Sequence, residues 1–202
     1  MSRLALKLLV LWLACASVAA QNGQALLNRA VAEFEQGRFA ASAAAFDELA
    51  AVIPDRAPQL WQRGIAQFYA GRYTDCRRQF ESHRRVNPDD VENAAWHFLC
   101  VAREQNLTAA RAALLPVGPD SRVPMRQVYQ MLRGELTPDQ VIKAGGSGLE
   151  GQFYGNLYVG LYQEVLGRKD VALQHIRTAA SDQFGRVGGY MHMVARVHLR
   201  TF

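Results

Sequence analysis

Histidine and methionine side chains are the first candidates for chemistry in this chain of 202 residues. Zinc hydrolases of the HExxH type need two histidines four residues apart on one helix, and no pair among the five histidines has that spacing. The run Met191-His192-Met193 offers soft ligands of the kind that copper prefers. On a helix, however, Met191 and Met193 point in different directions. Packing within a terminal helix explains this run better than a metal site does.

Signatures of covalent and nucleotide chemistry are absent from the sequence. It has no GxSxG elbow, no P-loop and no Cys-x-x-Cys pair. Asp89-Asp90 falls at the expected start of a helix, where negative charge is stabilised by the helix dipole. We therefore assign no reaction and no cofactor. An enzymatic or metal-binding helical domain is kept as an alternative to the function predicted below.

The first twenty residues predict a secretory signal peptide. Arg3 and Lys7 precede an apolar run over residues 8–14, and small residues lead to an expected cleavage after Ala20. The chain is therefore predicted to be secreted or periplasmic. One alternative is an uncleaved anchor. Another is lipidation of Cys15, although Trp12 stands where the bacterial lipoprotein pattern has leucine.

Loss of this leader changes the interpretation of the charge. The leader carries two basic and no acidic residues, so its removal lowers the formal net charge from +5 to +3. A mildly basic chain of this kind does not favour nucleic-acid binding, which requires a dense basic face.

Two cysteines remain after the leader, in a compartment that permits disulfides. Cys76 and Cys100 fall on helices expected to be neighbours, so a disulfide is possible. The alternative is two small apolar side chains that fill tight positions between helices.

Four arginines form a stripe on the helix expected over residues 74–85. Arg77 with Arg84, and Arg78 with Arg85, are seven residues apart and share one face. The stripe could bind an acidic protein surface or an anionic envelope polymer. The simpler interpretation is a solvated helix face.

The elements that position these residues follow from a repeat of 34 residues. Matching small, glycine, aromatic and proline positions are separated by this spacing in the pairs Ala30/Gly64, Gly37/Gly71, Phe39/Tyr73, Ser42/Cys76, Phe46/Phe80 and Pro54/Pro88. The pattern resembles the tetratricopeptide repeat (TPR). This resemblance implies an all-α, right-handed solenoid of helical hairpins, with about 10–11 helices after the leader, in one domain over residues 21–202.

The repeat divides this domain into units of unequal regularity. Regular repeats over 23–56 and 57–90 precede a degenerate unit over 91–118, a helical insert over 119–152, a further repeat over 153–186 and a capping helix over 187–202. The glycine-rich stretch over 145–151 is expected to be a mobile loop. A bulky residue at Gly64 should force its two helices apart.

The order of the units is also similar to that of one bacterial family. The similarity rests on Trp96, the run LCVAREQ over 99–105, the run YQMLRGELTPDQV over 129–141, and the pairs Phe153-Tyr154 and Leu161-Tyr162. Together they resemble the NlpI-type periplasmic lipoproteins. The resemblance implies a TPR adaptor that holds a protease and cell-wall hydrolases.

In stacked hairpins, the first helix of each unit lines the concave face. The residues expected to form a partner-binding groove there are Trp61, Ile65, Phe68, Tyr69, Glu92, Arg103 and Tyr154. We therefore predict a non-enzymatic adaptor that binds a protein segment in this groove. Two alternatives remain. Trp61 and Tyr69 could form a homodimer seam, or the C-terminal helices could fold into the groove and fill it.

Overall fold

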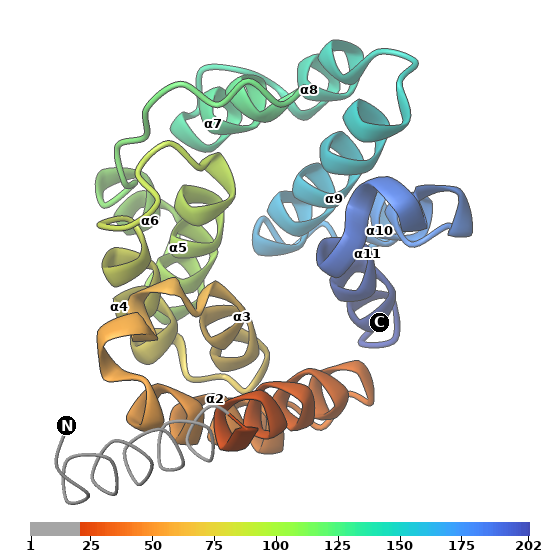
Figure 1. Cartoon of the computed structure of the whole chain (residues 1–202). Coiled ribbons are helices and arrows are strands. Elements are labelled where there is room, and N and C mark those ends of the chain that lie inside the picture. The colour runs from red at the N-terminus through yellow and green to blue at the C-terminus, as the bar shows by residue number, and fades with distance from the viewer. Residues whose placement is uncertain (1–20) are drawn as a thin grey trace, which may run out of the picture.

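The computed structural model describes residues 21–202 (Figure 1). Over this range the chain forms helices and no strands, beginning with a helix over residues 21–35. The first hairpins comprise α2 (Phe39–Val52), α3 (Trp61–Tyr69), α4 (Tyr73–His83), α5 (Val91–Glu104) and α6 (Leu107–Ala112). They are followed by α7 (Met125–Arg133), α8 (Pro138–Gly145), α9 (Leu149–Val165), α10 (Lys169–Ala179) and α11 (Gly185–Leu199).

Three hairpins share one turn geometry, and glycine is the reason. Gly37, Gly71 and Gly167 adopt φ values of 76°, 74° and 77°, which side chains with a Cβ rarely tolerate. At the second turn, the Arg72 N–H donates to the Gln67 carbonyl at 2.8 Å, five residues back. Both other turns make the same bond, which ends each first helix in a Schellman motif. The repeat in the sequence is therefore also a repeat in backbone structure.

Small residues let the helices of a hairpin approach closely. A Cβ built on Gly64 of α3 would lie 2.6 Å from the Phe80 ring of α4. Between α9 and α10 the same relation holds, where a Cβ on Gly160 would lie 2.7 Å from the Ile176 side chain. Phe80 and Ile176 are both buried. The predicted packing role of Gly64 is thus explained by the aromatic ring that occupies its side-chain space.

Some predicted boundaries are wrong. The second repeat was predicted to begin at residue 57, but Pro54–Gln59 forms a 3₁₀ helix across that boundary and α3 begins at Trp61. The predicted mobile loop over 145–151 is largely helical, because α8 ends at Gly145 and α9 begins at Leu149. Gly145 and Gly151 instead bring two backbones together, since a Cβ on Gly151 would lie 2.1 Å from the Gly145 carbonyl oxygen.

The helical insert predicted over residues 119–152 contains two short helices, α7 and α8. α8 begins with Pro138 at its first position. Thr137 forms a capping box with Gln140, in which the Thr137 hydroxyl accepts the Gln140 N–H at 3.3 Å and the Gln140 side chain accepts the Thr137 N–H at 2.8 Å. Figure 1 shows this insert bridging the first hairpins and the C-terminal helices.

The C-terminal helices turn back toward the start of the domain (Figure 1). On α11, the Tyr190 ring lies edge-on to Trp61 of α3, with ring centroids 5.0 Å apart, and 6.2 Å from Phe34 of the first helix. The Arg200 side chain donates to the Glu35 carbonyl. The inner face of the curved array is therefore partly covered by the chain's own last helix.

Candidate functional site

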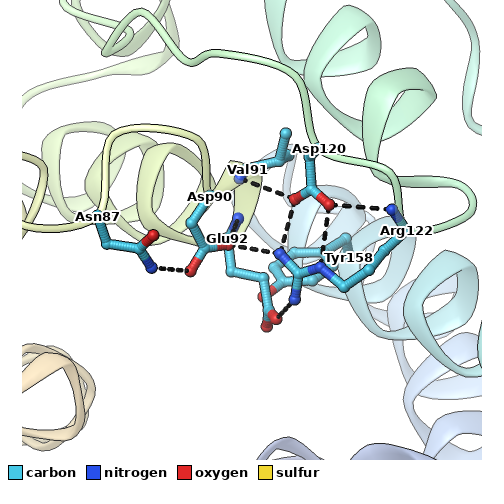
Figure 2. A network of polar contacts seen from close by, with 7 residues as sticks. All are labelled: Asn87, Asp90, Val91, Glu92, Asp120, Arg122 and Tyr158. Atoms are coloured by element: carbon cyan, nitrogen blue, oxygen red, sulfur yellow. Dashed lines mark hydrogen bonds and ion pairs between the residues drawn. The ribbon is translucent and has the colours of Figure 1, made fainter.

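A half-buried charge network lies at the N-terminal end of α5, centred on Arg122 (Figure 2). The Arg122 guanidinium donates to Asp120 through Nη2 at 2.6 Å and Nε at 3.0 Å, and to Asp90 at 2.6 Å. It also donates to Glu92 through Nη1. The other Glu92 oxygen accepts the Tyr158 hydroxyl of α9. The network thus ties α5, the loop before α7, and α9 to one guanidinium.

The N-terminus of α5 explains why two of these carboxylates lie there. The first N–H groups of a helix lack partners within the helix and attract negative charge. Asp90 caps α5 by accepting the Glu92 N–H at 2.9 Å, and Asp120 accepts the Val91 N–H at 3.1 Å. The predicted capping role of Asp90 is confirmed. The Asp90 oxygen that accepts the Glu92 N–H also accepts from Arg122.

Burial and charge shift the pKa values within the network. For Glu92, burial is the largest effect and raises the pKa of the carboxyl, although Arg122 opposes it. Burial would also raise the pKa of Asp120, but hydrogen bonds from Arg122 and Val91 outweigh it and the pKa is lowered. The pKa of Tyr154, whose ring lies 5.5 Å from the Arg122 guanidinium carbon, rises to about 12 through burial and the Glu92 charge.

A pocket of about 240 Å³ lies beside this network on the inner face. Its wall includes Asp90, Glu92, Arg122, the indoles of Trp61 and Trp96, and Asn93. Met191 of α11 closes part of it. The pocket is thus shared by the first hairpins, the Arg122 loop and the C-terminal helix.

Two side chains in this wall have buried polar atoms that find no hydrogen-bond partner among residues 21–202. Asn93 is 2% exposed, and neither its amide oxygen nor its amide nitrogen is bonded. Trp96 is 1% exposed, and its indole N–H is unbonded as well. Each such atom costs about 1–3 kcal/mol when it stays unpaired. A ligand that supplied both donors and acceptors would recover part of this cost.

The concave face predicted to form a groove is partly filled by the chain itself. Ile65 is fully buried and Phe68 is 6% exposed, so neither presents a surface to a partner. Tyr69 faces α11, where its hydroxyl lies 2.9 Å from His198 Nδ1. The physical reason is that α11 fills this end of the concave face, which is the alternative that the sequence left open. Trp61 and Tyr69 both contact α11, which also leaves less of either ring for a homodimer seam.

The other predicted groove residues have separate positions. Glu92 lines the pocket. Tyr154, on α9, packs against Arg122 and has 8% of its surface exposed. Arg103, at the far end of α5, pairs with Glu164 of α9 at 2.6 Å. Of the predicted set, the structure brings only Trp61 and Glu92 to the described pocket.

The arginine stripe on α4 is divided by its contacts. Arg77 pairs with Glu81 at 2.7 Å and with Glu104 at 3.1 Å, and Arg84 donates to the Pro116 carbonyl at 2.8 Å. Arg78 and Arg85 are exposed, and neither pairs with an acidic group within the described part of the chain. Arg77 and Arg84 therefore make polar contacts within the chain, and Arg78 and Arg85 are the two arginines of the stripe that point to solvent.

The remaining sequence candidates have structural positions. Cys76 of α4 and Cys100 of α5 form a disulfide, with Cα atoms 6.0 Å apart. His192 Nε2 lies 2.9 Å from the Ser181 carbonyl, and Met191 is buried. Within residues 21–202, no three His, Cys, Asp or Glu side chains are placed to hold a metal ion.

The predicted leader and Cys15 lie outside the described residues. From residue 21 onward, no helix combines the length and the apolar character needed to cross a membrane.

Sequence reasoning missed Arg122, Asp120 and Asn93. Arg122 and Asp120 belong to an irregular stretch that has no repeat partner, and their contacts reach about 30 residues back along the chain to Val91 and Glu92. A polar amide within the apolar run of α5 is the signal that could have identified Asn93, which lies three residues before Trp96.

No protein-family model matches the chain, and no curated protein matches it with significant similarity.

Proposed function

We propose that this chain is a TPR-like solenoid that acts as a non-enzymatic adaptor, secreted or periplasmic, and binds a segment of a partner protein at the pocket on its inner face. One observation carries the proposal. The pocket combines two indoles with the buried, unpartnered polar atoms of Asn93 and Trp96. Aromatic anchors around a desolvated polar centre are characteristic of the hot spots of protein interfaces.

The repeat supports the same assignment. Three turns with nearly identical glycine conformations and the close packing at Gly64 and Gly160 are what stacked helical hairpins require. The revised binding surface is smaller than the predicted groove, because α11 covers Tyr69. The partner segment would therefore contact the rim around Trp61 and Glu92 and insert one side chain into the pocket.

Photo-crosslinking in cells that naturally make the protein tests this proposal. A photoreactive aromatic amino acid, which keeps a ring at the pocket rim, replaces Trp61, and the same amino acid replaces Val171, which is 38% exposed on α10. We expect discrete crosslinked proteins from position 61 and none of them from position 171. Crosslinks to a second copy of this chain would indicate the homodimer instead. Equal products from both positions would refute the assigned surface.

A further inference from the structure

The pocket wall has more negative than positive charge. Of its lining residues, Asp90 and Glu92 supply two carboxylates to the single guanidinium of Arg122, which leaves a formal excess of one negative charge. Asp120, which is not part of the pocket wall, adds a third carboxylate to the same guanidinium. Nε, Nη1 and Nη2 of Arg122 all donate to these carboxylates. An anionic ligand would therefore have to displace an existing ion pair, whereas a cation would complement the charge.

The carboxylate oxygens keep capacity for a further donor. Each oxygen of an ionised carboxylate can accept about two hydrogen bonds. In Glu92, one oxygen accepts from Arg122 and the other from Tyr158. Asp90 and Glu92 both line the pocket. A cationic donor that entered it would meet acceptors already held in position by α5.

The pocket walls and volume limit what this cation can be. The lining residues include Trp61, Trp96 and Phe80, and aromatic rings attract cations. The volume of about 240 Å³ is smaller than that of the usual pockets for drug-sized ligands. One amino-acid side chain is a suitable occupant.

The unbonded groups of Asn93 and Trp96 favour a residue of a polypeptide over a free cation. The Asn93 oxygen can accept an N–H, while the Asn93 amide and the Trp96 indole need an acceptor. An arginine supplies the N–H groups, and carbonyl oxygens of neighbouring residues in the same segment supply the acceptors. Lysine offers a compact ammonium that stacks less well on indole.

We propose that the pocket beside Trp61, Asn93 and Trp96 receives an arginine side chain of the partner protein. This inference rests on the proposed adaptor function and names the residue type of the partner that the pocket binds. The guanidinium enters beside the aromatic side chains and donates to Glu92, and a rotation of the Asn93 side chain brings its buried oxygen to the same guanidinium.

A titration with two small probes tests this assignment without a known partner. The purified chain, labelled with ¹⁵N, is titrated with N-acetyl-arginine methylamide and with N-acetyl-citrulline methylamide, a neutral molecule of nearly the same shape. The indole N–H signal of Trp96 reports binding. We expect the arginine probe to shift this signal with at least about tenfold higher affinity than the citrulline probe. Equal affinities would overturn the inference.

Matched charge removals locate the effect. Glu92→Gln should weaken binding of the arginine probe by about tenfold. Glu81→Gln removes an exposed carboxylate of α4 outside the pocket and should leave the affinity unchanged. Equal effects of both variants would also overturn the inference. The probe comparison on the unmodified chain stands even if Glu92→Gln unfolds.

The two proposals fail separately. If the arginine probe binds but position 61 crosslinks to no protein, the pocket is retained and the adaptor function is wrong. If proteins crosslink at position 61 but the probe does not bind, the adaptor function is retained and the arginine assignment is wrong.

Discussion

At the scale of single residues, Asp120 is the group that fixes the Arg122 network. Its side chain is 6% exposed, and its two oxygens accept from the Arg122 side chain, the Arg122 N–H and the Val91 N–H. It therefore connects the loop before α7 to the first turn of α5. Loss of this carboxylate would leave a half-buried guanidinium with fewer partners and one end of α5 less well capped.

Asp120→Asn should lower the free energy of unfolding by about 2–3 kcal/mol at pH 7. The pKa of Asp120 is lowered in the folded state, so its contribution is present above the pKa of the unfolded chain, about 4, and is lost as the pH falls through the folded-state value. Urea unfolding at pH 7 and below pH 3 measures the difference, which should shrink in acid. The exposed Asp182→Asn serves as control. A difference that grew in acid would contradict this account.

At the scale of elements, glycines decide how the helices turn and how closely they pack. At Gly71 the requirement is conformational, because φ is 74° and the space around a built Cβ is open. At Gly64 the requirement is steric, because the Phe80 ring occupies the space of the missing side chain. Substitutions at these two positions therefore separate backbone strain from packing.

Gly71→Ala should lower the free energy of unfolding by about 1–2 kcal/mol, because the alanine Cβ clashes with the following carbonyl oxygen in the left-handed conformation. Gly71→Asn should cost less, since asparagine tolerates that region better. Chemical denaturation of the two variants provides the comparison. If asparagine destabilised more than alanine, strain at this turn would not be the cause.

Gly64→Ala should cost about 1–3 kcal/mol, because the added methyl group would force the buried Phe80 ring to move. Gly23→Ala is a matched control in the first helix, where a Cβ would lie at an ordinary 3.7 Å from the Leu49 side chain. Thermal unfolding should show a lower midpoint for the first variant alone. Similar midpoints for both would contradict the steric role of Gly64.

The disulfide acts on a pair of elements, α4 and α5. Its two cysteines are 24 residues apart, and closing a loop of that length stabilises a fold by about 3 kcal/mol through the unfolded chain. Replacement of both Cys76 and Cys100 by serine should remove this stabilisation. Reducing agent should then lower the unfolding midpoint of the unmodified chain and leave that of the variant unchanged. A shift in both would show that reduction acts elsewhere.

At the scale of the whole molecule, local structure could be predicted from the sequence, whereas most long-range contacts could not. The spacing of Gly37, Gly71 and Phe80 predicts hairpins, because turn chemistry and close packing act between residues near in sequence. The docking of Tyr190 on Trp61 has no such signal, since those residues are 129 positions apart and the contact depends on the curvature of the whole array. The sequence therefore predicted the inner face on which the pocket lies, but not that α11 forms part of the pocket wall.

We propose that the inner-face pocket, and not the outer surface, selects the partner. The direct measurement is quantitative capture of proteins from the native source by unmodified chain, Trp61→Ala and Val171→Ala, after each variant has been shown to remain folded. Loss of a central aromatic anchor typically weakens binding by 2 kcal/mol or more, about thirtyfold. We predict that Trp61→Ala loses the captured proteins while Val171→Ala retains them. Equal capture by all three chains would contradict the claim.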